Sequence, residues 1–285
     1  MLPKFSSILV VAFVVTGFLF AIFAYKNRND LGLRLLSFAK KVMSKSVNVE
    51  RISENESRPI SHAAWDSLLR KYVSDDGTVN YRGFLRKKNR LNAYLDTLSH
   101  HPPNETHWTK EERLAYWINA YNAFTVELIL THYPLKSIKE IGGNIPMINS
   151  PWDLKFFNIG GMDVDLNTIE HDILRKKFRE PRIHFAINCA SKSCPKLLNE
   201  AFSPEKIEQQ LQAQAVYFVN NPEKNRIRPN EIAVSQIFDW FQTDFTKDGS
   251  LIDFLNRFSR ANIAADAAIR YLDYDWRLNE KVFGE

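Results

Sequence analysis

The sequence predicts a mixed α+β domain, with many helices around a small, mostly antiparallel sheet, behind an N-terminal transmembrane helix. An uncharged apolar run occupies residues 8–25. After residue 61 helical periodicities dominate, and the few strand-like runs are short and joined by turn residues. Strands joined in hairpins, and not alternating with helices, argue for α+β and against a doubly wound parallel sheet.

The apolar run contains eighteen residues without a charge, which as a helix span roughly 27 Å. Lys4 before it also fits the start of a signal peptide, but its bulky C-terminal end lacks the small-x-small pattern of a cleavage site. We therefore predict, in chain order, an N-terminal tail (1–7), an uncleaved signal anchor (8–25), a polar and basic linker (26–60) and a globular domain (61–280).

The positive charges bear on partners and orientation. The net charge is +5, and the basic residues cluster behind the anchor and at 86–90, while elsewhere they alternate with acids. A basic segment beside a membrane contacts anionic lipid headgroups, so we predict a membrane partner and no nucleic acid. The positive-inside rule favours a cytoplasmic domain, but short N-terminal tails usually stay inside and large domains translocate regardless of charge. We expect a single-pass protein with an extracytoplasmic domain, periplasmic in a Gram-negative source.

The first half of the domain is expected to be helical, at about 61–73, 82–99 and 109–132. Thr109 and Glu112 have the spacing of a capping box at the start of the third helix. That helix is apolar on nearly every side, which predicts that it lies buried at the centre of the domain.

The second half is expected to combine hairpins with helices. Residues 182–188 are rich in β-branched and aromatic side chains and are predicted to form a buried strand. The other expected elements are a hairpin at 156–165 turning at Gly160-Gly161, a helix at 166–178 capped by Asp165, a hairpin around Pro229-Asn230, helices at 204–220, 235–246, 250–258 and 261–269, and a closing strand at 271–276.

Two asparagines, Asn119 and Asn122, project from the predicted central helix, three residues apart on one face. A buried amide that finds no partner costs about 1–3 kcal/mol, so both side chains are expected to be hydrogen-bonded. Either they hold the backbone of neighbouring loops, or they line a polar site where they orient a ligand or polarise a carbonyl.

The two cysteines of the chain, Cys189 and Cys194, follow the predicted buried strand. His184 lies five residues before Cys189, so in a regular strand the two side chains point to opposite faces. His171, on the preceding helix, is therefore favoured as the partner of Cys189. Glu170 and His171 border the apolar stripe of that helix.

Four roles are open for the cysteines. Cys189 is a nucleophile activated by an imidazole, or the pair forms a small-loop disulfide in an oxidising compartment. A zinc site with His171 and His184 is a third role, although the spacing matches no common zinc pattern. In the fourth, Cys189 is simply a buried apolar side chain. The sequence has no Gly-rich phosphate loop, HExxH or GxSxG motif, and we predict neither cofactor nor metal.

Several segments resemble the domain-of-unknown-function family 547, and the likeness covers most of residues 62–279. The resemblance implies an extracytoplasmic setting for bacterial members with N-terminal signals. It also implies that Asn119, Asn122, Glu170, His171, His184 and Cys189 fall within the characteristic motifs of the family. In plant members the position of Cys194 is often another residue, which weakens the disulfide and zinc roles. The segments are 117–123 (WINAYNA), 166–175 (LNTIEHDILR), 182–195 (RIHFAINCASKSCP), 235–245 (SQIFDWFQTDF) and 271–279 (YLDYDWRLN).

The predicted function is that of a membrane-anchored, thiol-dependent hydrolase or acyl transferase. Cys189 is the expected nucleophile and His171 or His184 the base, while Asn119 and Asn122 orient the substrate or stabilise an oxyanion. The alternative is a non-catalytic binding or scaffold module of the cell envelope, in which Cys189–Cys194 is a structural disulfide.

Overall fold

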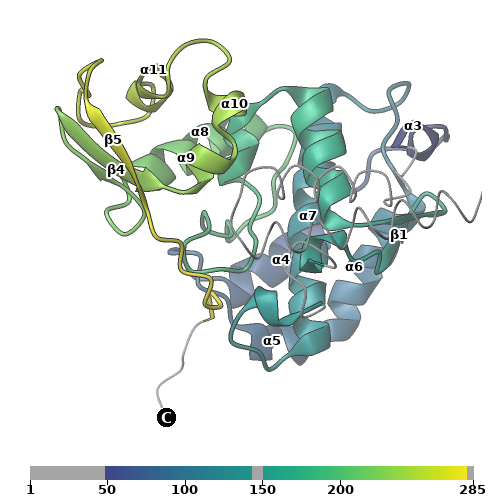
Figure 1. Cartoon of the computed structure of the whole chain (residues 1–285). Coiled ribbons are helices and arrows are strands. Elements are labelled where there is room, and N and C mark those ends of the chain that lie inside the picture. The colour runs from purple at the N-terminus through teal and green to yellow at the C-terminus, as the bar shows by residue number, and fades with distance from the viewer. Residues whose placement is uncertain (1–48, 143–149, 281–285) are drawn as a thin grey trace, which may run out of the picture. The chain divides into compact units, whose positions relative to one another are not determined.

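Helix α7 (Lys110–His132) is the central element of the computed structural model, which describes residues 49–142 and 150–280 (Figure 1). Its first turn is closed by the predicted capping box: Glu112 N donates to Thr109 Oγ1 over 3.2 Å, and Thr109 N donates to Glu112 Oε2 over 2.7 Å. Most of its side chains are buried, on all sides of the helix. The prediction of a buried central helix is confirmed.

Three helices cover one side of α7, namely α4 (Ala63–Tyr72), α5 (Tyr81–Leu85) and α6 (Lys88–His100). The first matches its prediction, whereas the single helix expected at 82–99 is divided into two. Trp65 of α4 stacks on Tyr94 of α6, with ring centroids 5.9 Å apart. Aromatic packing of this kind fixes the two helices against each other.

Residues 49–60, predicted as the end of the linker, are bonded to the segment that connects α6 with α7. Ile52, in the short helix α3 (Val49–Ile52), is only 1% exposed. The carbonyl oxygen of Ser57 accepts hydrogen bonds from Asn104 Nδ2 at 2.9 Å and from Trp108 Nε1 at 3.0 Å. The polar side chains of this segment also take part, since Asn55 Oδ1 accepts from Asn104 Nδ2 over 3.1 Å.

The predicted hairpin at 156–165 is confirmed. Strands β1 (Phe157–Ile159) and β2 (Met162–Val164) pair antiparallel, and they are joined by Gly160 and Gly161, whose φ angles are 61° and 79°. Positive φ values at both central residues are what a tight hairpin turn requires. Phe157 stacks on Phe124 of α7 with centroids 3.9 Å apart, which fixes the hairpin to the core.

A helix follows the hairpin as predicted, but it is a π-helix, η3 (Thr168–Phe178). Asp165 caps it, because its Oδ1 accepts from Thr168 N over 2.7 Å. The helix ends at Arg179, which adopts a left-handed conformation with φ 54°. π-Helical turns are rare and are frequently found at functional sites. Two short 3₁₀ helices, η1 (Ile138–Glu140) and η2 (Pro151–Asp153), precede the hairpin.

The predicted strand at 182–188 is wrong. The chain forms a 3₁₀ helix there, η4 (Pro181–Phe185), and continues as a loop to the cysteines. Pro181 favours the first turn of a helix, and Glu180 Oε1 caps it by accepting from Arg182 N over 3.0 Å. The apolar residues of this segment do serve burial, but they pack on α8 (Ile207–Asn220) without strand pairing. Because this segment is not a strand, His184 and Cys189 are not placed on opposite faces by strand alternation.

The C-terminal part contains a three-stranded sheet in the order β3 (Arg226–Ile227), β4 (Glu231–Ser235), β5 (Ala268–Leu272). The hairpin around Pro229-Asn230 is confirmed, but β4 pairs parallel with β5. The described strands thus form two small sheets, one antiparallel and one mixed, and the mixed α+β class is confirmed. The helices here are α8, α9 (Ile237–Trp240), α10 (Gln242–Phe245) and α11 (Leu251–Asn256).

The helix predicted at 261–269 is absent, and β5 begins at Ala268. Asn256 holds the chain extended at this point, since its side chain bonds both the N–H and the carbonyl of Ile263 over 2.9 Å. The predicted closing strand at 271–276 is correct only in its first residues. Among the residues that the structure describes, no helix combines the length and the apolar character needed to cross a membrane, and the predicted anchor at 8–25 lies outside them.

Candidate functional site

A cavity of about 180 Å³ lies beside the cysteine loop, between η3, η4, α9 and the segment after β5. Its walls are mainly aromatic, and its polar groups are few. Glu170, His171, His184 and Cys189, four of the residues singled out in the sequence, meet here. The lining residues are Tyr121, Trp152, Asn167, Glu170, His171, His184, Ile187, Cys189, Cys194, Pro195, Ile237, Trp240, Phe241, Tyr274 and Trp276.

The half-buried Cys189 sulfur is surrounded by hydrogen-bonding groups. Its Sγ lies 2.9 Å from Cys194 Sγ, 3.2 Å from Ser191 Oγ and 3.4 Å from the Tyr274 hydroxyl. Burial on its own raises the pKa of the Cys189 thiol. The hydrogen bonds from these three groups outweigh burial and lower the pKa to about 6. These hydrogen bonds therefore favour the thiolate form of Cys189.

Cys194 is buried, and its pKa is shifted in the opposite direction to that of Cys189. Its Sγ accepts a hydrogen bond from Cys189 N over 2.9 Å, and both cysteines are free thiols in the structure. Burial, reinforced by the neighbouring Cys189 thiolate, raises the pKa of Cys194 well above its ordinary value. Deprotonation is therefore favoured at Cys189 and disfavoured at the more deeply buried Cys194.

A set of amides fixes the backbone on both sides of Cys189. Asn122 Nδ2 donates to Ala186 O over 3.0 Å, and Asn122 Oδ1 accepts from Asn188 N over 2.8 Å. Asn188 in turn donates to Pro195 O over 2.7 Å and accepts from Ala190 N over 2.9 Å. The second of these bonds holds Ala190 in a left-handed conformation with φ 62°, immediately after the cysteine.

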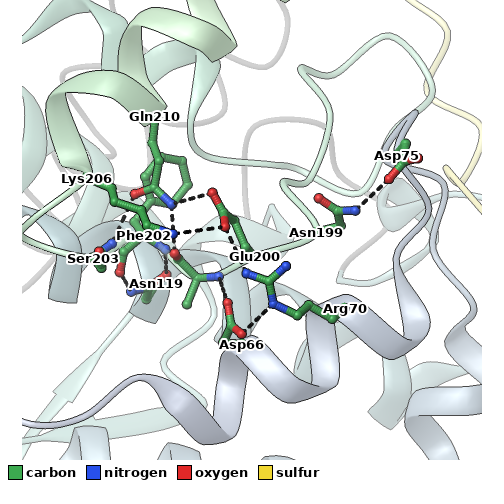
Figure 2. A network of polar contacts seen from close by, with 11 residues as sticks. Asp66, Arg70, Asp75, Asn119, Asn199, Glu200, Phe202, Ser203, Lys206 and Gln210 are labelled. Atoms are coloured by element: carbon green, nitrogen blue, oxygen red, sulfur yellow. Dashed lines mark hydrogen bonds and ion pairs between the residues drawn. The ribbon is translucent and has the colours of Figure 1, made fainter.

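Asn119 holds a different loop, the one that contains Phe202 (Figure 2). Its side chain bonds both backbone groups of Phe202, donating over 2.8 Å and accepting over 3.0 Å. Asn119 and Asn122 are 0% and 2% exposed, and neither lines the cavity. Their bonds are those expected if they hold loop backbone, and not those of oxyanion donors.

The C-terminal segment closes the site from the other side. Lys192 N donates to Arg277 O over 2.7 Å and Ser193 N to Asp275 O over 3.1 Å. Asp275 N returns a bond to Ser193 Oγ over 2.8 Å. These bonds position the neighbouring Tyr274, whose hydroxyl lies beside the Cys189 sulfur.

The histidines line the cavity and are held by acidic and basic neighbours. His184 Nε2 lies 2.8 Å from Asp244 Oδ2, and its Nδ1 lies 4.0 Å from Glu170 Oε1. Burial lowers the pKa of His184, although the hydrogen bond that its Nε2 donates to Asp244 acts in the opposite direction. His171 Nδ1 accepts from Arg175 Nη1 over 3.0 Å. The hydrogen bonds to the Cys189 sulfur described above come from the thiol of Cys194 and the hydroxyls of Ser191 and Tyr274, and not from these imidazoles.

Glu170 is buried, and its Oε2 accepts from the Tyr121 hydroxyl over 3.2 Å. Burial raises the pKa of Glu170 to about 7, and the negative charge at Cys189 adds to the rise. Asp244 behaves in the opposite way. Although burial opposes its ionisation, hydrogen bonds from His184 and Arg175 hold its pKa well below the usual range.

Sequence reasoning did not single out Ser191, Tyr274, Asp244, Arg175 or the aromatic walls. Asp244 and Tyr274 do lie in the two C-terminal segments, 235–245 and 271–279, that carry the family resemblance. That resemblance was the only signal available for them, because both lie far from the cysteines in sequence. Within the described part of the chain, no cluster of three or more His, Cys, Asp or Glu side chains is arranged to hold a metal ion.

Comparison with known proteins gives one family match, over part of the chain, and no function. Residues 105–219 match the family described as protein of unknown function, DUF547. This range includes α7, η3, η4, the cysteine loop and nearly all of α8, whereas Asp244 and Tyr274 lie beyond it. No curated protein and no solved structure matches the chain. The predicted resemblance to domain-of-unknown-function family 547 is thus confirmed over residues 105–219.

Proposed function

We propose that this chain is a thiol-dependent hydrolase or acyl transferase with Cys189 as its nucleophile. The observation that carries the proposal is the surroundings of the sulfur: three hydrogen-bonding groups within 3.4 Å, at the edge of a cavity. A thiolate that is both stabilised and accessible is what nucleophilic cysteine chemistry needs.

Glu170 replaces the predicted histidine base in this proposal. With a pKa of about 7 it is present in both protonation states near neutral pH, and it lines the same cavity as Cys189. The thiolate attacks the acyl carbon, the bond to the leaving group breaks, and the Glu170 carboxyl gives that group its proton. The resulting carboxylate then takes a proton from water or another acceptor as the acceptor attacks the thioester, and the thiolate is released.

The imidazoles act as positioning groups. His184 stacks on Phe241 at 4.0 Å and is fixed by its bond to Asp244, so that its other nitrogen faces Glu170. Arg175 links Asp244 to His171. This connected set packs beside Glu170, whose carboxyl accepts a hydrogen bond from Tyr121 and also responds to the charges of Cys189, Arg175 and Asp244.

The aromatic wall indicates the substrate class. Trp152 and Tyr274 both pack on Trp276, with centroids 5.7 and 4.5 Å away, and Trp240 packs on Tyr274 at 4.8 Å. A wall of this kind binds an apolar acyl group by burying its surface and by stacking. The cavity, of about 180 Å³, suits a short chain or a single ring.

The proposal is tested with p-nitrophenyl esters of short acyl groups. The full-length chain is expected to release a burst of one nitrophenolate per chain, with an acyl group on Cys189 found by mass spectrometry. Cys189→Ala abolishes the burst, whereas Lys192→Ala, an exposed side chain on the same loop, retains it. If iodoacetamide reaches Cys189 only after denaturation, the cysteine is a buried apolar residue and the proposal fails.

We also propose that residues 8–25 anchor the chain in a membrane, with the domain outside the cytoplasm. An uncharged run of this length supports an anchor. The chain is expected to remain in the membrane fraction after carbonate extraction. Protease added to intact cells or spheroplasts is expected to digest the domain, and a domain that is digested only after lysis would reverse the orientation.

A second candidate is a non-catalytic scaffold module with a permanent Cys189–Cys194 disulfide. The contact of the two sulfurs at 2.9 Å is the observation that favours it. The two candidates differ in the native thiol count. A scaffold shows no titratable thiol until a reductant is added, and reductant then lowers its stability.

A further inference from the structure

We propose that Cys189 and Cys194 form a reversible redox pair that hydroperoxides oxidise, with Cys189 as the attacked sulfur and Cys194 as the resolving thiol. The proposal uses the same thiolate as the proposed function, but it does not require acyl transfer. It assigns a second reaction, and a means of control, to the cysteine loop.

The geometry makes the two sulfurs unequal. Both cysteines line the aromatic cavity, but Cys189 is half-buried whereas Cys194 is only 6% exposed. Ser191 and Tyr274 place hydroxyl groups 3.2 and 3.4 Å from Cys189 Sγ. An oxidant entering the cavity therefore meets Cys189 first, because nucleophilic sulfur needs both access and stabilised negative charge.

The second sulfur is already in contact with the first. Cys194 Sγ lies 2.9 Å from Cys189 Sγ, and it accepts the Cys189 N–H. The intervening turn is closed by Cys194 N donating to Ser191 O over 3.2 Å. A sulfenic acid formed on Cys189 would thus have its resolving thiol at hand, without rearrangement of the loop.

The steps balance with a hydroperoxide and a dithiol as co-reactants. The Cys189 thiolate attacks the outer peroxide oxygen, the O–O bond breaks, and the alkoxide takes a proton to leave as an alcohol. The Cys194 sulfur then attacks the sulfenic acid, releases water and forms the disulfide. An external dithiol restores both thiols by exchange and becomes a disulfide itself.

The walls of the cavity favour an organic hydroperoxide over hydrogen peroxide. Trp240, Tyr274 and Trp276 form a contiguous aromatic surface beside the sulfur, with neighbouring centroids 4.5 to 5.7 Å apart. A phenyl-bearing peroxide gains stacking and burial there that hydrogen peroxide does not. This gain corresponds to about a tenfold increase in the ratio of the two peroxide rates, compared with the same ratio for a free thiol.

The test uses the full-length chain with hydrogen peroxide and cumene hydroperoxide in separate arms. Native protein is expected to lose two hydrogen atoms in mass and regain them with dithiothreitol. In Cys194→Ser, one oxygen is added instead and is captured by dimedone at Cys189. The ratio of the cumene hydroperoxide rate to the hydrogen peroxide rate is expected to exceed that of free cysteine by about tenfold, and to fall in Trp240→Ala.

Two results overturn the proposal. The first is direct oxidation of native protein to sulfinic acid with no disulfide, and the second is a disulfide that dithiothreitol cannot open without denaturation. An equal preference for both peroxides removes only the organic specificity. Because the ester burst is measured separately on reduced protein, a chain without esterase activity can still pass this test, and the reverse also holds.

Discussion

At the scale of single residues, the amides show what the sequence could and could not predict. The apolar surroundings of Asn119 and Asn122 predicted that both are buried and hydrogen-bonded, and this is confirmed. Their partners could not be predicted, because Phe202 and Asn188 lie in loops more than sixty residues away in sequence. The role of Asn122 beside the cysteine loop follows only from the folded chain.

Replacing Asn122 with alanine is expected to destabilise the fold by about 2–4 kcal/mol, because Asn188 N and Ala186 O lose their partner in a buried place. The apparent pKa of Cys189 is expected to rise as the loop relaxes. Denaturant titration and the pH dependence of iodoacetamide labelling measure the two effects. Asn119→Ala is the matched control, since it removes the same amide from the same helix without touching the cysteine loop. Equal effects of both variants on Cys189 would contradict the assignment.

Glu170 makes stability depend on pH. Its pKa is raised to about 7 in the folded chain from 4.5, so folding favours the protonated form. This contribution is fully present below about pH 4.5 and is lost as the pH rises through about 7, with a loss of about 3 kcal/mol. Urea titrations at about pH 5 and pH 8 are expected to show this loss in the native chain but not in Glu170→Gln. The control Glu205→Gln, at an exposed position, is expected to show the same loss of stability as the native chain.

At the scale of elements, the hydrophobic pattern predicted which segments are buried better than it predicted their secondary structure. The run after Pro181 is buried as predicted, yet it is a 3₁₀ helix and a loop, because an apolar run this short is compatible with either structure. The proline and the capping Glu180 were the local signals for a helical turn. The π-helix η3 could not be predicted either, since its register depends on packing against α7 and η4.

The end of η3 offers a test of this local geometry. Arg179 has φ 54°, a conformation that costs a non-glycine residue free energy. Arg179→Gly is therefore expected to stabilise the chain by about 0.5–1 kcal/mol. Lys177→Gly, two residues earlier within the helix, is expected to lower stability by about 1 kcal/mol. Thermal or urea unfolding of the two variants should move in opposite directions, and a loss in both would show that Arg179 is not strained.

At the scale of the whole molecule, the sequence predicted the α+β class and the central helix but not the composition of the site. The cavity is assembled from η3, η4, the cysteine loop, α9 and the segment after β5, which span more than a hundred residues. The parallel pairing of β4 with β5 was hidden because the intervening segment, including residues 261–267, resembles a helix in composition. A cavity assembled from segments that lie far apart in the chain leaves no local sequence pattern from which it could be predicted.

The N-terminal limit of the fold gives the last prediction. A chain that begins at Val49 is expected to be more stable than one that begins at Ser61 by about 2–4 kcal/mol. The shorter chain loses the buried Ile52 and the Ser57 carbonyl that satisfies Asn104 and Trp108. Urea titration compares the two, and Ile52→Ala in the longer chain isolates the apolar share. If the two chains are equally stable, the fold begins near residue 60, as the sequence predicted.

The bonds between the cysteine loop and the C-terminal segment have a consequence for biosynthesis. Tyr274, which helps to stabilise the Cys189 thiolate, is made eighty-five residues after it and arrives only when 275–277 pair with 192–193. While a ribosome is still translating β4 and α9, the Cys189 sulfur therefore lacks the Tyr274 hydroxyl, one of the three groups whose hydrogen bonds lower its pKa. The full set of hydrogen bonds around the sulfur is complete only after nearly all of the described chain has been made.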